Sequence, residues 1–210
     1  MTESDFERPS GLVLSLCDRT GNMVRPWAEA GYPCMTVDIQ RQAEEIPNVT
    51  RLQTDVRRFL PPRTTYAAVF AFTPCTHLAV SGARWFKEKG LHGLTEALEV
   101  AEACVRICEW ADARWMLENP VSTLASYWRK PDYIFDPCDY GGYLMPGGDA
   151  YTKKTCLWTG GGFVMPAKRP VSPTEGSKMH RLGPSVERAN KRSETPMGLA
   201  RAVFEANGGR

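Results

Sequence analysis

Two short segments place a reactive side chain next to proline at the end of a predicted strand. Pro74-Cys75 follows the apolar run Tyr66–Phe72, and Glu118-Asn119-Pro120 follows the run Ala113–Leu117. Proline restricts the backbone ahead of the Cys75 thiol and can present it to a cleft. A thiol and a carboxylate on neighbouring strand ends suit attack on a conjugated ring, in which the acid interacts with a ring nitrogen. By itself, Cys75 is equally consistent with a buried loop cysteine, and Glu118 with the cap of a turn.

Acidic residues follow three further predicted strands. The loop Cys17–Gly21 comes directly after the first strand, where backbone N–H groups and a glycine allow a ligand to approach closely. Asp38 ends the second strand and is placed to accept hydrogen bonds from a ribose diol, although a surface acid that caps the next helix is nearly as good an interpretation. Asp55 follows the third strand. Together these residues indicate a nucleotide-type ligand.

The positions of these residues depend on five predicted strands that alternate with helices. The strands lie at Gly11–Leu16, Cys34–Val37, Thr50–Gln53, Tyr66–Phe72 and Ala113–Leu117. Apolar spacing of three and four residues predicts helices over Leu94–Ala111 and Arg188–Asn207, with loops and short strands from Ser122 to Arg169. The alternation indicates an α/β fold, with a mostly parallel sheet and helices on both faces. Because ligands bind beyond the carboxyl ends of such strands, the reactive residues share one rim.

Charge is distributed unevenly along the 210 residues. Residues 1–120 carry 13 Lys and Arg against 16 Asp and Glu, a net charge of −3, whereas residues 121–210 carry 13 against 8, a net charge of +5. The later part is therefore expected to face a polyanion, although a solvated basic surface is a common alternative. The chain length suits one domain with a small loop-rich C-terminal appendage.

Composition argues against several other classes of protein. The seven cysteines form no C-x-x-C pair and are accompanied by only three histidines, so neither a disulfide framework nor a metal site is expected. No apolar run approaches the roughly 20 residues of a membrane helix. The start Met1–Ser10 has neither the basic region nor the apolar core of a signal peptide. We therefore expect a cytoplasmic protein that does not bind membranes.

The order of these motifs resembles that of the DNA (cytosine-5-)-methyltransferases, and it is most similar to the short forms encoded by phages. Those forms carry stretches similar to Pro74–Gly82, to Lys153–Trp158, and to His180-Arg181 followed by Arg192-Ser193. The resemblance spans roughly Val13 to Ala202 and depends on motif order. It implies a Rossmann-like S-adenosylmethionine-dependent methyltransferase fold and, for a phage protein, a location in the cytoplasm of the bacterial host.

The resemblance also assigns a reaction to Cys75 and Glu118. Cys75 is the nucleophile that adds to carbon 6 of cytosine, and Glu118 holds nitrogen 3 and the exocyclic amine. Carbon 5 then accepts the methyl group of S-adenosylmethionine, after which loss of the carbon 5 proton and elimination of the thiol release the product. The partner is double-stranded DNA, from which the target cytosine must be flipped to reach the pocket.

The remaining site residues follow from the same resemblance. Residues 1–120 are expected to form the cofactor-binding and catalytic core, 121–187 a small loop-rich region that faces DNA, and 188–210 a C-terminal helix that returns to the core. The cofactor would be bound around its methionine part by Cys17, Asp18 and Gly21, at its ribose by Asp38, and at its adenine by Asp55 and Val56. The expected DNA contacts are Lys153, Lys154, Arg181 and Arg192.

Some features of the chain depart from the larger family members. The first loop contains a single glycine, Thr76 stands where glutamine is usual, and Pro120 follows Asn119 where valine is commoner. The arginine motif of the larger enzymes is missing after Asn119. Only about thirty residues separate Trp158 from Lys191, which is too few for a recognition domain of its own. A short or loose sequence specificity is expected.

Four other functions fit parts of the pattern. An RNA cytosine-5 methyltransferase would carry a Thr-Cys nucleophile at the fifth strand, where this chain has Glu118. Amino-group methyltransferases place an Asp/Asn/Ser-Pro-Pro-aromatic motif at Thr73–Thr76, and a cysteine hydrolase built from Cys75 with His77 or His180 lacks an orienting motif. A catalytically silent DNA- or cofactor-binding protein would need neither the thiol nor the carboxylate.

Overall fold

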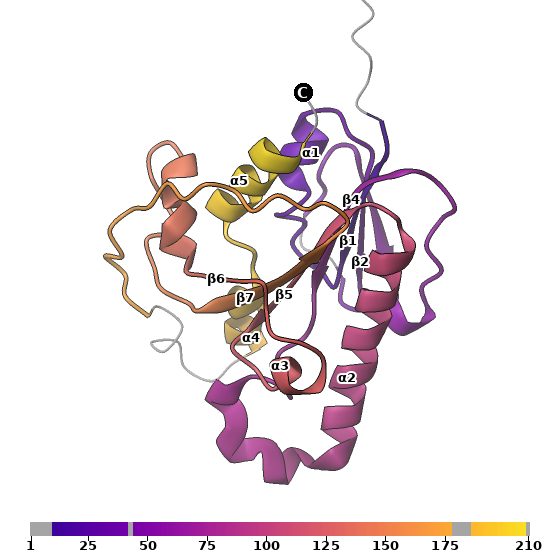
Figure 1. Cartoon of the computed structure of the whole chain (residues 1–210), viewed down its shortest axis with the longest axis vertical. Helices are drawn as coiled ribbons and strands as arrows, with labels where there is room; N and C mark the ends of the chain where they lie inside the picture. The colour runs from indigo at the N-terminus through magenta and orange to yellow at the C-terminus, as the bar shows by residue number, and fades with distance from the viewer. Residues whose placement is uncertain (1–9, 42–43, 178–185, 209–210) are drawn as a thin grey trace, which may run out of the picture.

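The computed structural model describes residues 10–41, 44–177 and 186–208, which form one sheet with helices on both sides (Figure 1). The strands are β1 (Leu12–Leu16), β2 (Cys34–Asp38), β3 (Val49–Gln53), β4 (Tyr66–Phe72), β5 (Arg114–Pro120), β6 (Tyr133–Phe135) and β7 (Thr155–Gly160). The α-helices are α1 (Arg25–Glu29), α2 (Phe86–Trp110), α3 (Leu124–Tyr127), α4 (Val186–Ser193) and α5 (Met197–Asn207). Short 3-10 segments are η1 (Val56–Arg58), η2 (Val80–Trp85) and η3 (Pro137–Tyr143).

The seven strands form a Rossmann-like sheet in the order β3-β2-β1-β4-β5-β7-β6. Strands β1 to β5 are parallel, whereas β7 runs antiparallel to both of its neighbours, β5 and β6. The predicted α/β class with a mostly parallel sheet is confirmed. The strand order reverses between β1 and β4, and this reversal opens the crevice in which such folds bind ligands.

The central strands are buried on both faces because their side chains alternate between two apolar layers. On one face, Leu14, Val69 and Leu117 pack with the buried face of α2. On the other face, Val13 and Phe70 pack with residues of α1 and α5. Figure 1 shows α2 on one side of the strands and α1 with α5 on the other. The prediction of helices on both faces is confirmed.

The region 121–187 does more than form loops. Its strands β6 and β7 complete one edge of the sheet, and Trp158 of β7 is fully buried. Trp128 stacks on this ring at a centroid distance of 5.9 Å. Trp128 and Trp158 therefore belong to the same core as strands β4 and β5, because β7 pairs directly with β5.

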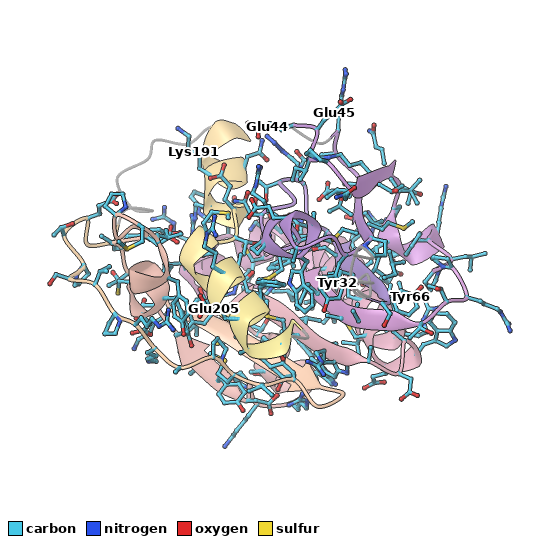
Figure 2. The ribbon with its side chains drawn as sticks, turned by 90° about the horizontal axis from the view of Figure 1, so that it is seen from above. Tyr32, Glu44, Glu45, Tyr66, Lys191 and Glu205 are labelled. Carbon is cyan, nitrogen blue, oxygen red and sulfur yellow. The ribbon has the colours of Figure 1, made fainter. Side chains whose placement is uncertain are left out.

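The helical pattern predicted over 188–207 forms two helices in place of one. Helix α4 ends at Ser193, and α5 begins at Met197, with Pro196 at its N-cap. A proline inside a helix removes one backbone hydrogen bond and clashes with the preceding turn, which explains the break. In Figure 2 the two helices are marked by Lys191 on α4 and Glu205 on α5.

Candidate active site

Cys75 lies three residues beyond β4, at the start of a tight turn. Its carbonyl oxygen accepts hydrogen bonds from the backbone N–H groups of Leu78, at 3.0 Å, and Ala79, at 2.8 Å. The side chain is only partly buried, whereas Leu78 is completely buried and anchors the turn in the core. The thiol is therefore held on a fixed backbone at the rim of the sheet.

Side-chain hydrogen bonds from the end of β5 fix the segment that leads from β4 into this turn. Glu118 pairs with Phe72 of β4 in the sheet register. The next residue, Asn119, is fully buried, and its side-chain Nδ2 donates to the carbonyl oxygen of Thr73 at 2.9 Å and to the Thr73 hydroxyl at 3.0 Å. These bonds position Cys75 relative to Glu118, because they join the two strand ends directly.

Thr73 and Asn119 were not predicted as site residues, and Asn119 carried the clearer signal. A buried side-chain amide needs partners, so an asparagine at the end of an apolar strand indicates a specific hydrogen bond. Both residues act on the site through the backbone of the Cys75 loop.

Lys153 faces Glu118 from the neighbouring strand end. Its Nζ lies 3.8 Å from Oε1 of Glu118 and donates a 2.7 Å hydrogen bond to the carbonyl oxygen of Arg192 at the end of α4. The side chains of Lys153 and Glu118 are 17% and 14% exposed. Within the described ranges, Oε1 of Glu118 has no hydrogen-bond partner. A small cavity in front of it is lined by Phe72, Phe135, Thr155 and Leu199, among others.

Burial controls the protonation of both reactive groups. It raises the pKa of the Glu118 carboxyl, and the neighbouring Lys153 ammonium lowers that pKa in part. Burial also raises the pKa of the Cys75 thiol, and the charge of Glu118 raises it further. Lys153 and Arg192 act in the opposite direction on the thiol. The site therefore shifts the carboxyl group toward its protonated form, and the two nearby cations oppose the effect of burial on the thiol.

The loop after β1 adopts a constrained conformation. Cys17 has a φ of +56°, and its Sγ lies 3.9 Å from that of Cys104 on α2. The buried carboxylate of Asp18 accepts hydrogen bonds from the hydroxyls of Ser15, at 2.8 Å, and Thr20, at 3.0 Å, and from the backbone N–H of Gly21, at 2.7 Å. Gly21 has a φ of +71°, which favours glycine. Asp18 thus shapes the loop that would surround a ligand.

Asp38 and Asp55 lie at the carboxyl ends of β2 and β3, next to this loop. Oδ1 of Asp38 accepts a 2.7 Å hydrogen bond from the backbone N–H of Gln40, and burial raises the pKa of this carboxyl. The carboxylate of Asp55 is bound by Arg57 at 2.6 Å, which lowers its pKa. Val56 is buried beside it. Asp18, Asp38 and Asp55 therefore follow three adjacent strands, as expected for residues at the carboxyl ends of parallel strands.

The residues expected to contact DNA lie in different surroundings. Lys154 is exposed, whereas Lys153 points to Glu118 and Arg192 is partly buried. Arg181 lies outside the described residues. Among the three of these cations that the structure describes, only Lys154 is therefore exposed, and Lys153 lies against Glu118.

Two further findings concern the described residues as a set. None of their helices is long and apolar enough to cross a membrane. Across the same ranges, no group of three or more His, Cys, Asp and Glu side chains could hold a metal ion.

No family model matches this chain, and no curated relative matches its sequence. Among solved structures, the crystal structure of the glycopeptide N-methyltransferase MtfA aligns with 14% sequence identity and a TM-score of 0.33. The alignment covers 71% of this chain, and this chain spans 65% of that enzyme's length. The function is therefore inferred from this chain's own residues.

Replacing Asp38 with Ala is expected to weaken the binding of S-adenosylmethionine by about 1–3 kcal/mol, because a buried acceptor of ribose hydrogen bonds is lost. Isothermal titration calorimetry measures the effect. Glu102→Ala removes an exposed carboxylate from α2 and should bind as the parent does. An unchanged affinity in Asp38→Ala would place the ribose elsewhere.

Proposed function

We propose that this chain is a methyltransferase that transfers a methyl group from S-adenosylmethionine to carbon 5 of cytosine in double-stranded DNA. The observation that carries the proposal is the placement of Cys75 and Glu118 at adjacent parallel strand ends: Glu118 is the register partner of Phe72, Cys75 follows Phe72 by three residues, and the bonds from Asn119 to Thr73 join the two ends. A nucleophile and a general acid on neighbouring strand ends suit addition to a ring in which a nitrogen atom takes up the displaced electron pair.

Cys75 and Glu118 would act together in the first step. The Cys75 thiolate forms a bond to carbon 6 of cytosine, and the electron pair of the 5,6 double bond moves into the ring. Glu118, whose pKa is raised by burial, would donate a proton to nitrogen 3 and thereby neutralise the developing charge. Lys153 and Arg192 stabilise the attacking thiolate.

The cofactor fits the adjacent rim. Asp38 keeps acceptor capacity beyond its bond to Gln40, as a ribose diol requires. Gly21 keeps the turn after β1 compact, because a Cβ at this position would lie 2.9 Å from Cδ1 of Ile46, so the space that a side chain would need is already filled. The bound group would supply an electrophilic methyl group. To complete turnover, the Glu118 carboxylate would take back the proton from nitrogen 3, and water would accept the proton of carbon 5. The electron pair of that C–H bond would re-form the 5,6 double bond as the Cys75–carbon 6 bond breaks and releases the thiolate.

Methyl transfer itself tests the proposal. The protein is incubated with S-adenosylmethionine labelled in its methyl group and with duplex DNA or structured RNA, and the nucleosides are then separated. Label in 5-methylcytosine from DNA is expected. Label only in RNA would favour the RNA enzyme, and no label in either, with intact DNA binding, would favour a silent binding protein.

Binding to duplex DNA is expected to depend on Lys154, because this exposed cation lies beside the catalytic Lys153. Lys154→Ala should reduce the magnitude of the slope of log affinity against log salt by about 0.9, the contribution of one phosphate contact. Fluorescence anisotropy over a salt series measures this slope. Lys168→Ala removes the same charge from an ion pair with Asp139. Equal slope changes in the two variants would contradict a specific contact at Lys154.

A further inference from the structure

A second hollow, of about 390 Å³, adjoins the catalytic turn. It lies between this turn, the start of α2 and the short helix α3, and its walls include His77, Phe86, Lys87, Lys89, Thr123 and Tyr127. Its volume falls in the range of roughly 300–1,000 Å³ that is typical of small-molecule sites. The reaction assigned to Cys75 and Glu118 does not use these residues.

The hollow shares its wall with the catalytic turn through direct bonds. Nζ of Lys89 donates to the carbonyl oxygen of Thr76. On the other side, the backbone N–H of Thr123 donates to the carbonyl oxygen of Leu78 at 2.9 Å, and the Thr123 hydroxyl donates to the same oxygen at 3.3 Å. A ligand in this hollow would therefore lie directly behind the turn that carries Cys75.

A break in α2 shapes the basic side of the hollow. Gly90 has a φ of +65° and interrupts the helix, and a Cβ built on it would meet no atom within 4 Å. The first turn of α2, which carries Lys87 and Lys89, is thereby separated from the long regular part of the helix. Figure 1 shows this part of the chain projecting from one end of the molecule.

The lining combines the groups that recognise a nucleotide. Phe86 and Tyr127 offer aromatic faces from two different elements, and Tyr127 is 57% exposed. Lys87 is exposed, and the ammonium of Lys89 has further donors beside its bond to Thr76, so both can contact phosphate. Nδ1 of His77 is buried and, within the described ranges, has no hydrogen-bond partner. It faces α2, because a Cβ built on Gly93 would lie 2.6 Å from it, so the His77 ring is a packed wall of the hollow.

We propose that this hollow binds an unpaired nucleotide of the DNA strand that carries the target cytosine, at a position flanking the target. The base would stack on Tyr127 and Phe86, and its phosphate would contact Lys87 and Lys89. Base–aromatic stacking and a basic channel are the usual elements of single-strand recognition. This inference rests on the proposed function. It supplies a contact to the target strand beyond the target cytosine without a separate recognition domain.

The test uses duplexes built around a cytosine that the protein methylates. Each flanking nucleotide on the target strand is replaced in turn by an abasic residue, and binding is measured with the Cys75→Ser variant so that no turnover intervenes. At one flanking position the abasic residue should weaken binding about five- to 150-fold, the effect of losing one stacked base. In the double variant with Tyr127→Ala this penalty should fall below about twofold, as expected when the two changes remove one interaction.

Two further variants keep the result interpretable. Phe86→Ala tests the second aromatic wall and should also reduce the abasic penalty, whereas Tyr133→Ala removes an exposed tyrosine of β6 and should leave it unchanged. Thermal unfolding verifies that each variant is folded. An abasic penalty that persists in both Tyr127→Ala and Phe86→Ala, or that is absent in the parent, would overturn this inference while methylation stands. A chain that methylates no DNA would overturn the proposed function as well.

Discussion

Cys75→Ser is expected to abolish methylation of DNA, with a loss on the order of 10⁴-fold or more, as is usual when a covalent nucleophile is removed. The serine hydroxyl ionises far less readily than a thiol and cannot form the bond to carbon 6 at a useful rate. Calorimetry should show unchanged S-adenosylmethionine binding, because Cys75 follows β4 whereas the proposed cofactor residues follow β1, β2 and β3. The measurement is transfer of labelled methyl groups under single-turnover conditions.

The covalent step has its own signature. DNA that contains 5-fluorocytosine cannot lose a proton from carbon 5, so the parent should remain bonded to it and appear as a protein–DNA adduct in a denaturing gel. Peptide mapping by mass spectrometry should place the adduct at Cys75. Cys138→Ser changes a cysteine outside the proposed site and should retain the adduct. An adduct at Cys17, Cys138 or Cys156, or full methylation by Cys75→Ser, would contradict the mechanism.

Glu118→Gln is expected to slow methylation at least about 10²-fold, the usual effect of losing a positioned acid–base group. Glutamine still fills the space and can donate a hydrogen bond to nitrogen 3, but it cannot transfer a proton. The loss should appear in the rate of the chemical step, while DNA affinity changes little. Glu109→Gln on the exposed face of α2 is the matched control and should react as the parent does.

The pH dependence of the methylation rate distinguishes an acid–base role of Glu118 from a purely structural role. Burial raises the pKa of both groups, and the active pair holds one proton, with the thiol ionised and Glu118 protonated. Activity should therefore rise with pH as the pair loses its first proton and fall as it loses the second. In Glu118→Gln only the thiol titrates, so the falling limb should disappear. The rising limb of the parent follows loss of the first proton from the pair, which leaves most readily from the carboxyl group, whereas the rising limb of Glu118→Gln follows ionisation of the thiol alone. The remaining limb should therefore move to higher pH. A falling limb that persists in Glu118→Gln would contradict this assignment.

Local patterns were sufficient to predict the parallel part of the sheet. Strands β1, β2, β4 and β5 are largely apolar because both of their faces are buried, whereas the edge strand β3 is more polar and partly exposed. Each predicted run overlaps the observed strand. Parallel strands end on the same rim, so the order of Asp18, Asp38, Asp55, Cys75 and Glu118 along the chain predicted that they would lie on one edge. Their position at one edge of the sheet could be predicted from the order of the strands, whereas their chemical roles are proposals.

The tertiary structure alone decided what surrounds the Cys75–Glu118 pair. Lys153 is 35 residues from Glu118 in sequence, and it reaches the carboxylate only because β7 inserts antiparallel beside β5, with Pro120 opposite Thr155. No local pattern encodes that register, since a cation before a short strand equally suits a solvated surface. The sequence alone therefore assigned Lys153 to DNA contact, whereas the fold places it against Glu118.

The hollow behind the catalytic turn has the same origin. Its walls come from His77, from the first turn of α2 and from α3, which meet because Thr123 bonds to Leu78 and Lys89 bonds to Thr76. The sequence by itself determined the strands and the residues at their ends, because burial and alternation act over a few neighbouring positions. Contacts between distant segments depend on side-chain packing and hydrogen bonds that form only when the chain has folded, so the surroundings of those residues were decided by the tertiary structure.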